Sequence, residues 1–148
     1  MLGADIPDST VLILGCGPIG CFAVGGARAA GASLVIASDF NPRRLELARA
    51  MGAHVILNPG SDDVVGRVRE LTGGLGVDVV CEMSGHPTGH QQALDATRAG
   101  GRTHLLGTPN RTTEGDFARE RSLEGRTRGG ATGAGRQQTG DRRRRDAP

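Results

Sequence analysis

A glycine-rich turn between an apolar segment and a helical pattern is the feature that most constrains the fold of this chain. Residues 10–14 (TVLIL) form a continuous apolar run, which is typical of a strand buried on both faces. Three glycines follow at once, Gly15, Gly17 and Gly20, and residues 19–30 then carry apolar side chains at helical spacing. A strand, a tight turn and a helix in this order predict the start of a strand–helix–strand unit.

The same alternation continues along the chain. Further strands are predicted at residues 33–38, 54–57, 77–82 and 102–106. Further helices are predicted at residues 41–51, 62–71 and 90–99. Strands separated by helices indicate a parallel sheet, because parallel neighbours need crossover connections, and these place helices on both faces. We therefore expect an α/β domain with a doubly wound parallel sheet over about residues 9–109.

Several apolar side chains are expected to be buried in this domain. In the second helix these include Leu47 and Met51, which we expect to face inward with their apolar neighbours. Cys16, Cys21 and Cys81 show no Cys-x-x-Cys pairing, so neither a disulfide framework nor a Cys-rich zinc site is indicated. Three small buried thiols suit a reducing cytosol. We expect a cytoplasmic protein, since no run approaches the roughly 20 apolar residues of a membrane span and no signal peptide is visible.

Charge and apolar content change near residue 110. Residues 1–110 hold 8 basic and 10 acidic side chains, whereas residues 111–148 hold 10 and 6, and every basic residue is Arg. Apolar residues number 48 in the first part and 6 in the second. Because so few apolar groups cannot offset the entropy of ordering, we predict a packed domain over 1–110 and an Arg/Gly-rich, largely disordered tail over 111–148. The four arginines at 142–145 leave a nucleic-acid contact as the less favoured alternative to a solvated tail.

The glycine pattern indicates a dinucleotide site. The first glycine permits a tight turn off the strand, the second lets backbone approach a pyrophosphate, and the third lets the helix pack closely on the strand. The helix start then offers free N–H groups and a positive dipole end to phosphates. Asp39 follows Gly20 by 19 residues, at the end of the next predicted strand, where a carboxylate binds ribose hydroxyls.

NADP and S-adenosylmethionine are the two alternative ligands of such a site. A carboxylate at Asp39 repels a 2′-phosphate and favours NAD over NADP, although Arg43 and Arg44 reduce that preference. Methyltransferases that use S-adenosylmethionine share the glycine-rich turn, but their first strand usually ends in an acid where this chain has Leu14. The Pro18-Ile19 pair also favours a dinucleotide.

Three segments together resemble the coenzyme domain of medium-chain, zinc-dependent alcohol dehydrogenases. They are VLILGCGPIG, ASDFNPRRLELARAMGA and DVVCEMSGHPTGHQQALDATRAGGRTHLLGTP. Within that family, residues 82–85 (EMSG) followed by Pro87 are most similar to the L-threonine 3-dehydrogenase branch. The resemblance covers about residues 6–109 and reaches weakly to residue 133. It implies a Rossmann fold, NAD as cofactor and an oxidoreductase function.

The resemblance also implies which residues hold the cofactor. Ile19 would contact it at the glycine-rich turn, and Asp39 with Arg44 would hold the adenosine ribose. Residues 106–108 would line the nicotinamide half, and residues 131–132 would match a further nicotinamide-side contact. The full implied cofactor-binding set is Gly15, Gly17, Pro18, Ile19, Gly20, Asp39, Arg44, Leu106, Gly107, Thr108, Ala131 and Thr132.

This chain departs from the family in two respects. The family's catalytic zinc is held by a separate domain, which we do not expect in this chain. The four histidines, His54, His86, His90 and His104, are scattered, so we also expect no metal site and no catalytic residue. The family's last strand is aliphatic, but the matching residues 125–129 (GRTRG) contain two arginines. Because buried arginines are costly, the sheet is expected to be truncated there. In the family this part of the sheet also forms the subunit contact, so the family's oligomerisation is not expected.

Two interpretations follow from these departures. In the first, the chain is the NAD-binding portion of a zinc-dependent dehydrogenase that oxidises a secondary alcohol such as the 3-hydroxyl of threonine, and is inactive by itself. In the second, it is an inactive truncated or frame-shifted fragment, because an Arg/Gly-rich end after an altered strand is what a shifted frame yields. The expected partner is the dinucleotide, with no membrane and no nucleic acid.

Overall fold

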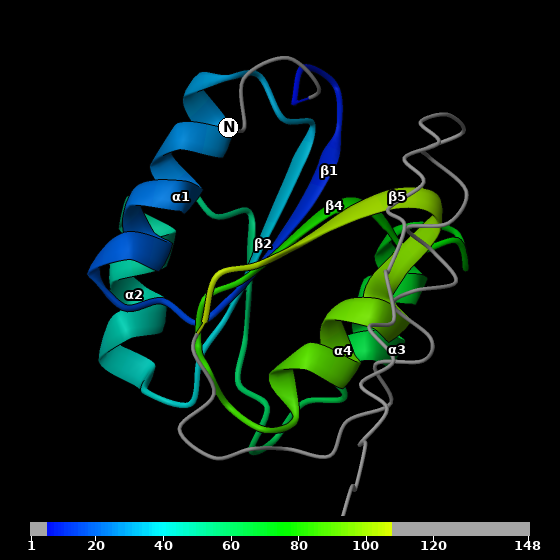
Figure 1. Cartoon of the computed structure of the whole chain (residues 1–148). Helices are drawn as coiled ribbons and strands as arrows, with labels where there is room; N and C mark the ends of the chain where they lie inside the picture. The colour runs from blue at the N-terminus through cyan, green and yellow to red at the C-terminus, as the bar shows by residue number, and fades with distance from the viewer. Residues whose placement is uncertain (1–5, 108–148) are drawn as a thin grey trace, which may run out of the picture. The chain divides into compact units, whose positions relative to one another are not determined.

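Five parallel strands form one twisted sheet in the computed structural model, which describes residues 6–107 (Figure 1). The strands are β1 (Thr10–Leu14), β2 (Leu34–Ser38), β3 (Val55–Leu57), β4 (Val77–Glu82) and β5 (Thr97–Leu105). They lie in the order β3-β2-β1-β4-β5, and every neighbouring pair is parallel. The parallel sheet predicted from the alternating pattern is therefore confirmed.

The helices cover both faces of this sheet. They are α1 (Pro18–Ala29), α2 (Pro42–Ala50), α3 (Val64–Leu71) and α4 (Gly89–Ala96). Helices α1 and α2 pack on one face, and α3 and α4 on the other, which confirms the doubly wound α/β fold (Figure 1). Val11 and Ile13 point to the first face, Leu12 and Leu14 to the second, so a continuous apolar strand serves two cores. No helix in residues 6–107 is long and apolar enough to cross a membrane.

Successive strands are added first on one side of β1 and then on the other, and this change of direction marks the expected position of a binding site. From β1 the chain moves outward to β2 and β3, then crosses back to β4 on the other side of β1. The register aligns Leu14 with both Ser38 and Glu82, so three strands end at the same edge. Open α/β sheets bind ligands at the carboxyl ends of strands, where the strand order reverses. The glycine-rich turn lies at this point.

The boundary between α4 and β5 was predicted wrongly. Residues 97–99 were assigned to the helix, but α4 ends at Ala96 and Thr97 already pairs with Val77 of β4. Thr97 Oγ1 donates to the carbonyl of Ala93 at 2.7 Å and so closes the last turn. Gly100 has φ +75° and lies inside an irregular stretch of β5. The pair Gly100-Gly101 is compatible with a helix end and with an irregular strand, and the pairing of Thr97 with Val77 of β4 decides for the strand.

The inward orientation predicted for part of α2 was also wrong. Leu45 is buried, but Leu47 and Met51 are exposed, as is Phe22 on α1. These side chains border a hollow of about 540 Å³ beside the glycine-rich turn. Helix α2 therefore buries only a narrow stripe, which includes Leu45 and Ala48.

The three cysteines are free and buried, as expected. Burial raises the pKa of the Cys16 thiol to about 12, with a further contribution from the nearby Asp39 carboxylate. Burial alone raises the pKa of Cys81 to about 11. At neutral pH both thiols are therefore protonated and are poor nucleophiles.

Asp78 fastens the edge of the sheet opposite the glycine-rich turn. Its Oδ2 accepts hydrogen bonds of 2.7 Å from Thr10 N and Thr10 Oγ1, and its own N–H donates to Thr10 Oγ1 at 2.9 Å. Arg98 Nε lies 2.5 Å from Asp78 Oδ1. Burial raises the pKa of Asp78, but the bonds from Thr10 and Arg98 outweigh it and hold the pKa below its ordinary 3.8.

Replacing Asp78 by Asn is expected to lower the free energy of unfolding by about 1–2 kcal/mol at neutral pH, because charged hydrogen bonds are lost at a partly exposed site. Since the folded-state pKa is depressed, the wild-type advantage is complete above the unfolded-state pKa and is lost as pH falls through the folded-state value. Urea unfolding near neutrality and at about pH 2 measures this difference. Asp95→Asn, at a carboxylate that accepts from Gln91, is the control. A difference that is the same at both pH values would contradict the assignment.

Candidate functional site

The glycine-rich turn is shaped by close backbone contacts at its first and third glycines. Gly15 has φ +93° and donates to the carbonyl of Ser38 at 2.8 Å. A Cβ at Gly15 would lie 2.7 Å from Ser84 N, so the turn also packs directly on the loop after β4. A Cβ at Gly20 would collide with the Gly15 carbonyl. The third glycine thus lets the first turn of α1 approach the strand end, as its position predicts.

The second glycine is different, because nothing in the described residues occupies the space beside it. Gly17 is the N-cap residue of α1, with φ −65° and ψ −174°, and no atom lies within 4 Å of the position a Cβ would take. Within residues 6–107 no side chain caps the helix, and Pro18 occupies its first turn. Ile19 is 73% exposed on the same turn. The amino end of α1 therefore presents uncapped backbone N–H groups to an open space.

Asp39 joins the end of β2 to this turn. Its Oδ2 accepts from Cys16 N at 2.8 Å and its Oδ1 accepts from Asn41 N at 2.7 Å. Arg44 on α2 lies 3.8 Å from the same carboxylate, whose side chain is 9% exposed. The two residues expected to hold a ribose are thus adjacent, and the carboxylate is held in place by backbone donors on either side.

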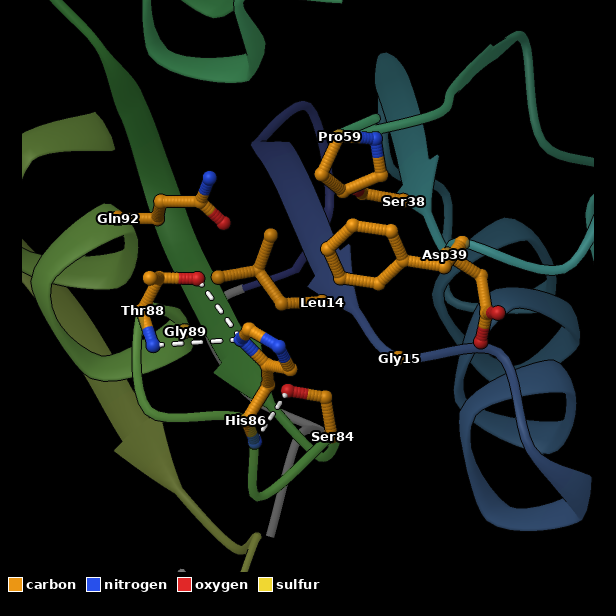
Figure 2. Close-up of a pocket in the computed structure, with 11 residues that line it drawn as sticks. Leu14, Gly15, Ser38, Asp39, Pro59, Ser84, His86, Thr88, Gly89 and Gln92 are labelled. Atoms are coloured by element: carbon orange, nitrogen blue, oxygen red, sulfur yellow. Dashed lines mark hydrogen bonds between the residues drawn. The ribbon is translucent and has the colours of Figure 1, made fainter. Parts of the chain in front are cut away.

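A small pocket of about 40 Å³ lies beside Asp39, between the ends of β1 and β2 and the loop after β4 (Figure 2). Its lining includes Phe40, Pro59 and His86. The rings of Phe40 and His86 lie 5.1 Å apart at an angle of 44°. Both rings were missed from the sequence, since each follows a strand end without a recognised motif. Their position after β2 and β4 is the signal that would have found them.

Leu106 and Gly107 lie at the same edge of the sheet, just after β5. Both backbone N–H groups donate to the Glu82 carbonyl, at 2.8 and 2.9 Å. Leu106 is exposed, while a Cβ at Gly107 would collide with Gly85 N and with Glu82 Oε2. Of the remaining sequence-predicted residues, Thr108, Ala131 and Thr132 lie outside the described residues. So does the segment 125–129, for which an abnormal last strand was expected.

The described residues do not fit a zinc site. Residues 6–107 contain no group of three or more His, Cys, Asp or Glu side chains that could hold a metal ion. All four histidines and all three cysteines of the sequence fall within this range. Zinc sites in proteins draw mainly on His and Cys, so these side chains do not assemble the zinc centre that the resemblance associates with the family.

Solved structures with the same fold include alcohol dehydrogenases. The alcohol dehydrogenase from Thermus sp. ATN1 matches with a TM-score of 0.69 and 36% identity, over 72% of this chain and 31% of that one. Benzyl alcohol dehydrogenase from Acinetobacter calcoaceticus matches with a TM-score of 0.72 and 34% identity, over 80% of this chain and 33% of that one. The Rossmann-type architecture of the described residues is that of these enzymes.

Sequence comparison gives the family. The model of the zinc-binding dehydrogenase family matches residues 18–139, and the chain belongs to that family. L-threonine 3-dehydrogenase from Symbiobacterium thermophilum is 48% identical over 132 residues, which are 89% of this chain and 38% of that enzyme. Sorbitol dehydrogenase from Bacillus subtilis is 41% identical over 104 residues, covering 70% of this chain and 30% of the relative. The chain therefore spans less than two fifths of the curated relatives it matches. The family resemblance expected from the sequence is confirmed.

Proposed function

We propose that residues 6–107 bind NAD(H) and form the cofactor-binding part of a zinc-dependent alcohol dehydrogenase. The observation that carries the proposal is the open space at Gly17, between an uncapped helix start and the carboxylate of Asp39. A pyrophosphate fits there because backbone can approach it without a Cβ in the way. Family membership and the alcohol dehydrogenase fold support the same conclusion.

Different residues at the carboxyl edge of the sheet would contact different parts of the cofactor. The N–H groups at the start of α1 would bind the pyrophosphate, and the free lone pairs of Asp39 would accept from the ribose hydroxyls. The exposed ring of Phe40 offers an apolar surface to the adenine. The ring centroids of Phe40 and His86 lie 5.1 Å apart, so an adenine that lies between the two rings must move them apart. Leu106 and Gly107 would face the nicotinamide half. The role of Asp39 favours NAD over NADP.

The chemistry of the bound cofactor is hydride transfer at the nicotinamide ring. The residues described here bind and orient that ring, and none of them is assigned to the proton transfer or to zinc. The names of the relatives support L-threonine as the substrate of the whole dehydrogenase. We propose that the alcohol site and its zinc lie outside residues 6–107, and that this chain alone binds cofactor without oxidising alcohol.

Replacing Gly17 by Ala tests the proposal directly. The backbone of Gly17 suits any residue and its Cβ position is open, so the variant should fold as the wild type does. The methyl group would stand where the pyrophosphate approaches, so the Kd for NADH should rise about tenfold or more. NADH fluorescence measures this without interference, because the chain has no Trp and no Tyr.

Gly26→Ala is the matched control. Gly26 lies on α1 nine residues after Gly17, and in the described part of the chain nothing lies within 4 Å of its Cβ position either. This variant should bind NADH as tightly as the wild type and be slightly more stable, since Ala is a better helix former. Equal NADH affinity in all three proteins would contradict the site, and absence of binding by the wild type would contradict the function.

A further inference from the structure

A buried carboxylate lies beneath the proposed cofactor edge and has no role in cofactor contact. Glu82 ends β4, between β1 and β5, and its side chain is 0% exposed. Its Oε1 accepts from Ser84 N at 2.9 Å and also from Ser84 Oγ. Its Oε2 lies 3.6 Å from His90 Nε2, and neither of these two buried atoms has a hydrogen-bond partner among residues 6–107. Burying a carboxylate is costly, and an apolar residue would suit this strand end better, so Glu82 needs an explanation.

Hydrogen bonds lead from Glu82 outward to the pocket beside Asp39. Ser84 Oγ, which donates to the carboxylate, accepts from His86 N at 3.0 Å. His86 Nδ1 then lies 2.9 Å from Thr88 Oγ1, and Figure 2 shows these bonds closing the loop after β4. The loop presents the His86 ring to Phe40. The conformation of one wall of the pocket therefore depends on the buried carboxylate.

A second set of contacts leads from Glu82 to the other half of the edge. Its backbone carbonyl accepts from Leu106 N and Gly107 N, and its Oε2 lies against Gly107, where a Cβ would collide with it. The same Cβ would collide with Gly85 N, so the loop after β4 and the segment after β5 meet over the carboxylate. Glu82 thus contacts both segments that flank the proposed cofactor, the loop after β4 through its side chain and the segment after β5 through its backbone carbonyl and the packing of its side chain against Gly107.

We propose that Glu82 is a positioning residue for the dinucleotide site and that His90 is the donor to its second oxygen. The inference rests on the proposed function. A movement of about half an ångström brings His90 Nε2–H into hydrogen-bond distance of Oε2 and satisfies both unpartnered atoms. Glu82 then accepts at both oxygens, from Ser84 on one side and from His90 on the other, and it fixes the loop without touching the cofactor.

Glu82→Gln tests this arrangement because Gln keeps the shape but has one acceptor and one donor. Whichever way the amide is turned, a donor faces either Ser84 or the His90 N–H. The full-length chain carrying this change should bind NADH about tenfold more weakly than the wild type, as expected for a misplaced buried hydrogen bond. Glu70→Gln, at an exposed carboxylate of α3 that pairs with Arg67, is the matched control and should leave the Kd unchanged.

A double variant separates positioning from a general loss of structure. In Glu82→Gln with His90→Gln, the two amides can pair, one donating and the other accepting, so NADH affinity should recover to within about threefold of the wild type. The amide proton signals of Ser84 and His86 in NMR spectra should shift in Glu82→Gln and return toward their wild-type positions in the double variant. If Glu82→Gln does not fold, His90→Leu, which removes the donor to Oε2, should by itself weaken NADH binding by several-fold.

The outcomes distinguish the inference from the proposed function. A folded Glu82→Gln variant that binds NADH within twofold of the wild type, with unshifted Ser84 and His86 signals, overturns the positioning role and leaves the NAD site standing. A wild-type chain that does not bind NADH removes the proposed function. In that case, the amide signals alone decide whether Glu82 and His90 set the loop.

Discussion

Replacing Gly15 by Ala is expected to destabilise the domain by about 2–4 kcal/mol, because a side chain must adopt φ +93° and its Cβ must lie 2.7 Å from Ser84 N. For a domain of about 100 residues this lowers the Tm by roughly 10 °C or more. The neighbour that must move is backbone, which cannot yield as the end of a flexible side chain can. Thermal unfolding followed by circular dichroism measures the change.

Comparing the Gly→Ala substitution at three positions separates an effect on stability from an effect on NADH affinity. Gly15→Ala should lose stability, Gly17→Ala should lose NADH affinity with its stability kept, and Gly26→Ala should lose neither. The three positions lie within the turn and helix α1, and each substitution adds the same single methyl group. A Gly15→Ala variant as stable as the wild type would show that the turn does not pack on the loop after β4.

Asp39→Asn is expected to change cofactor preference more than any other single substitution. The change removes the charge that repels a 2′-phosphate and leaves Arg44, now 3.8 Å from a neutral group, available to bind one. The Kd for NADH should rise about tenfold, and the preference for NADH over NADPH should fall by roughly thirtyfold or more. Titrations with both reduced cofactors measure the ratio.

A neutral substitution elsewhere on the surface controls for net charge. Asp95→Asn makes the same chemical change on α4, where the carboxylate accepts from Gln91, and should leave both affinities as they are. If Asp39→Asn weakens NADH and NADPH binding equally, the carboxylate only supports the turn through Cys16 N and does not select the cofactor.

The fold could be predicted from local patterns because each element has a clear signal. The run at residues 10–14 is uniformly apolar, Pro42 follows the N-cap Asn41, and Asp63 caps α3 by accepting from Gly66 N. The order of the strands is a long-range property. The crossover rule predicts that the strands are parallel and that helices cover both faces, and the order itself comes from the structure. The helix was wrongly expected to include Thr97 because the pair Gly100-Gly101 suits a helix end and an irregular strand equally well. Only the pairing of Thr97 with Val77 shows that the strand has already begun there.

The site was predicted in part for a similar reason. Gly15, Asp39 and their neighbours belong to a spacing that carries a known chemistry, so their positions near one another follow from the motif. Phe40 and His86 are single residues after strand ends, and they are brought together only when β2 and β4 lie on either side of β1. Glu82 was used as a family signature, but nothing in the sequence indicates that its carboxylate is buried.

The three buried thiols make this domain a reporter of its own opening. Cys16 lies in the glycine-rich turn and Cys81 in the interior strand β4, and the raised pKa of each keeps it protonated while the fold is intact. An alkylating reagent added in a short pulse therefore labels a thiol only when its surroundings open. The labelling rate at Cys16 follows fluctuations of the turn, whereas the rate at Cys81 follows separation of the sheet. Two positions in one chain thus time local and global opening without any introduced probe.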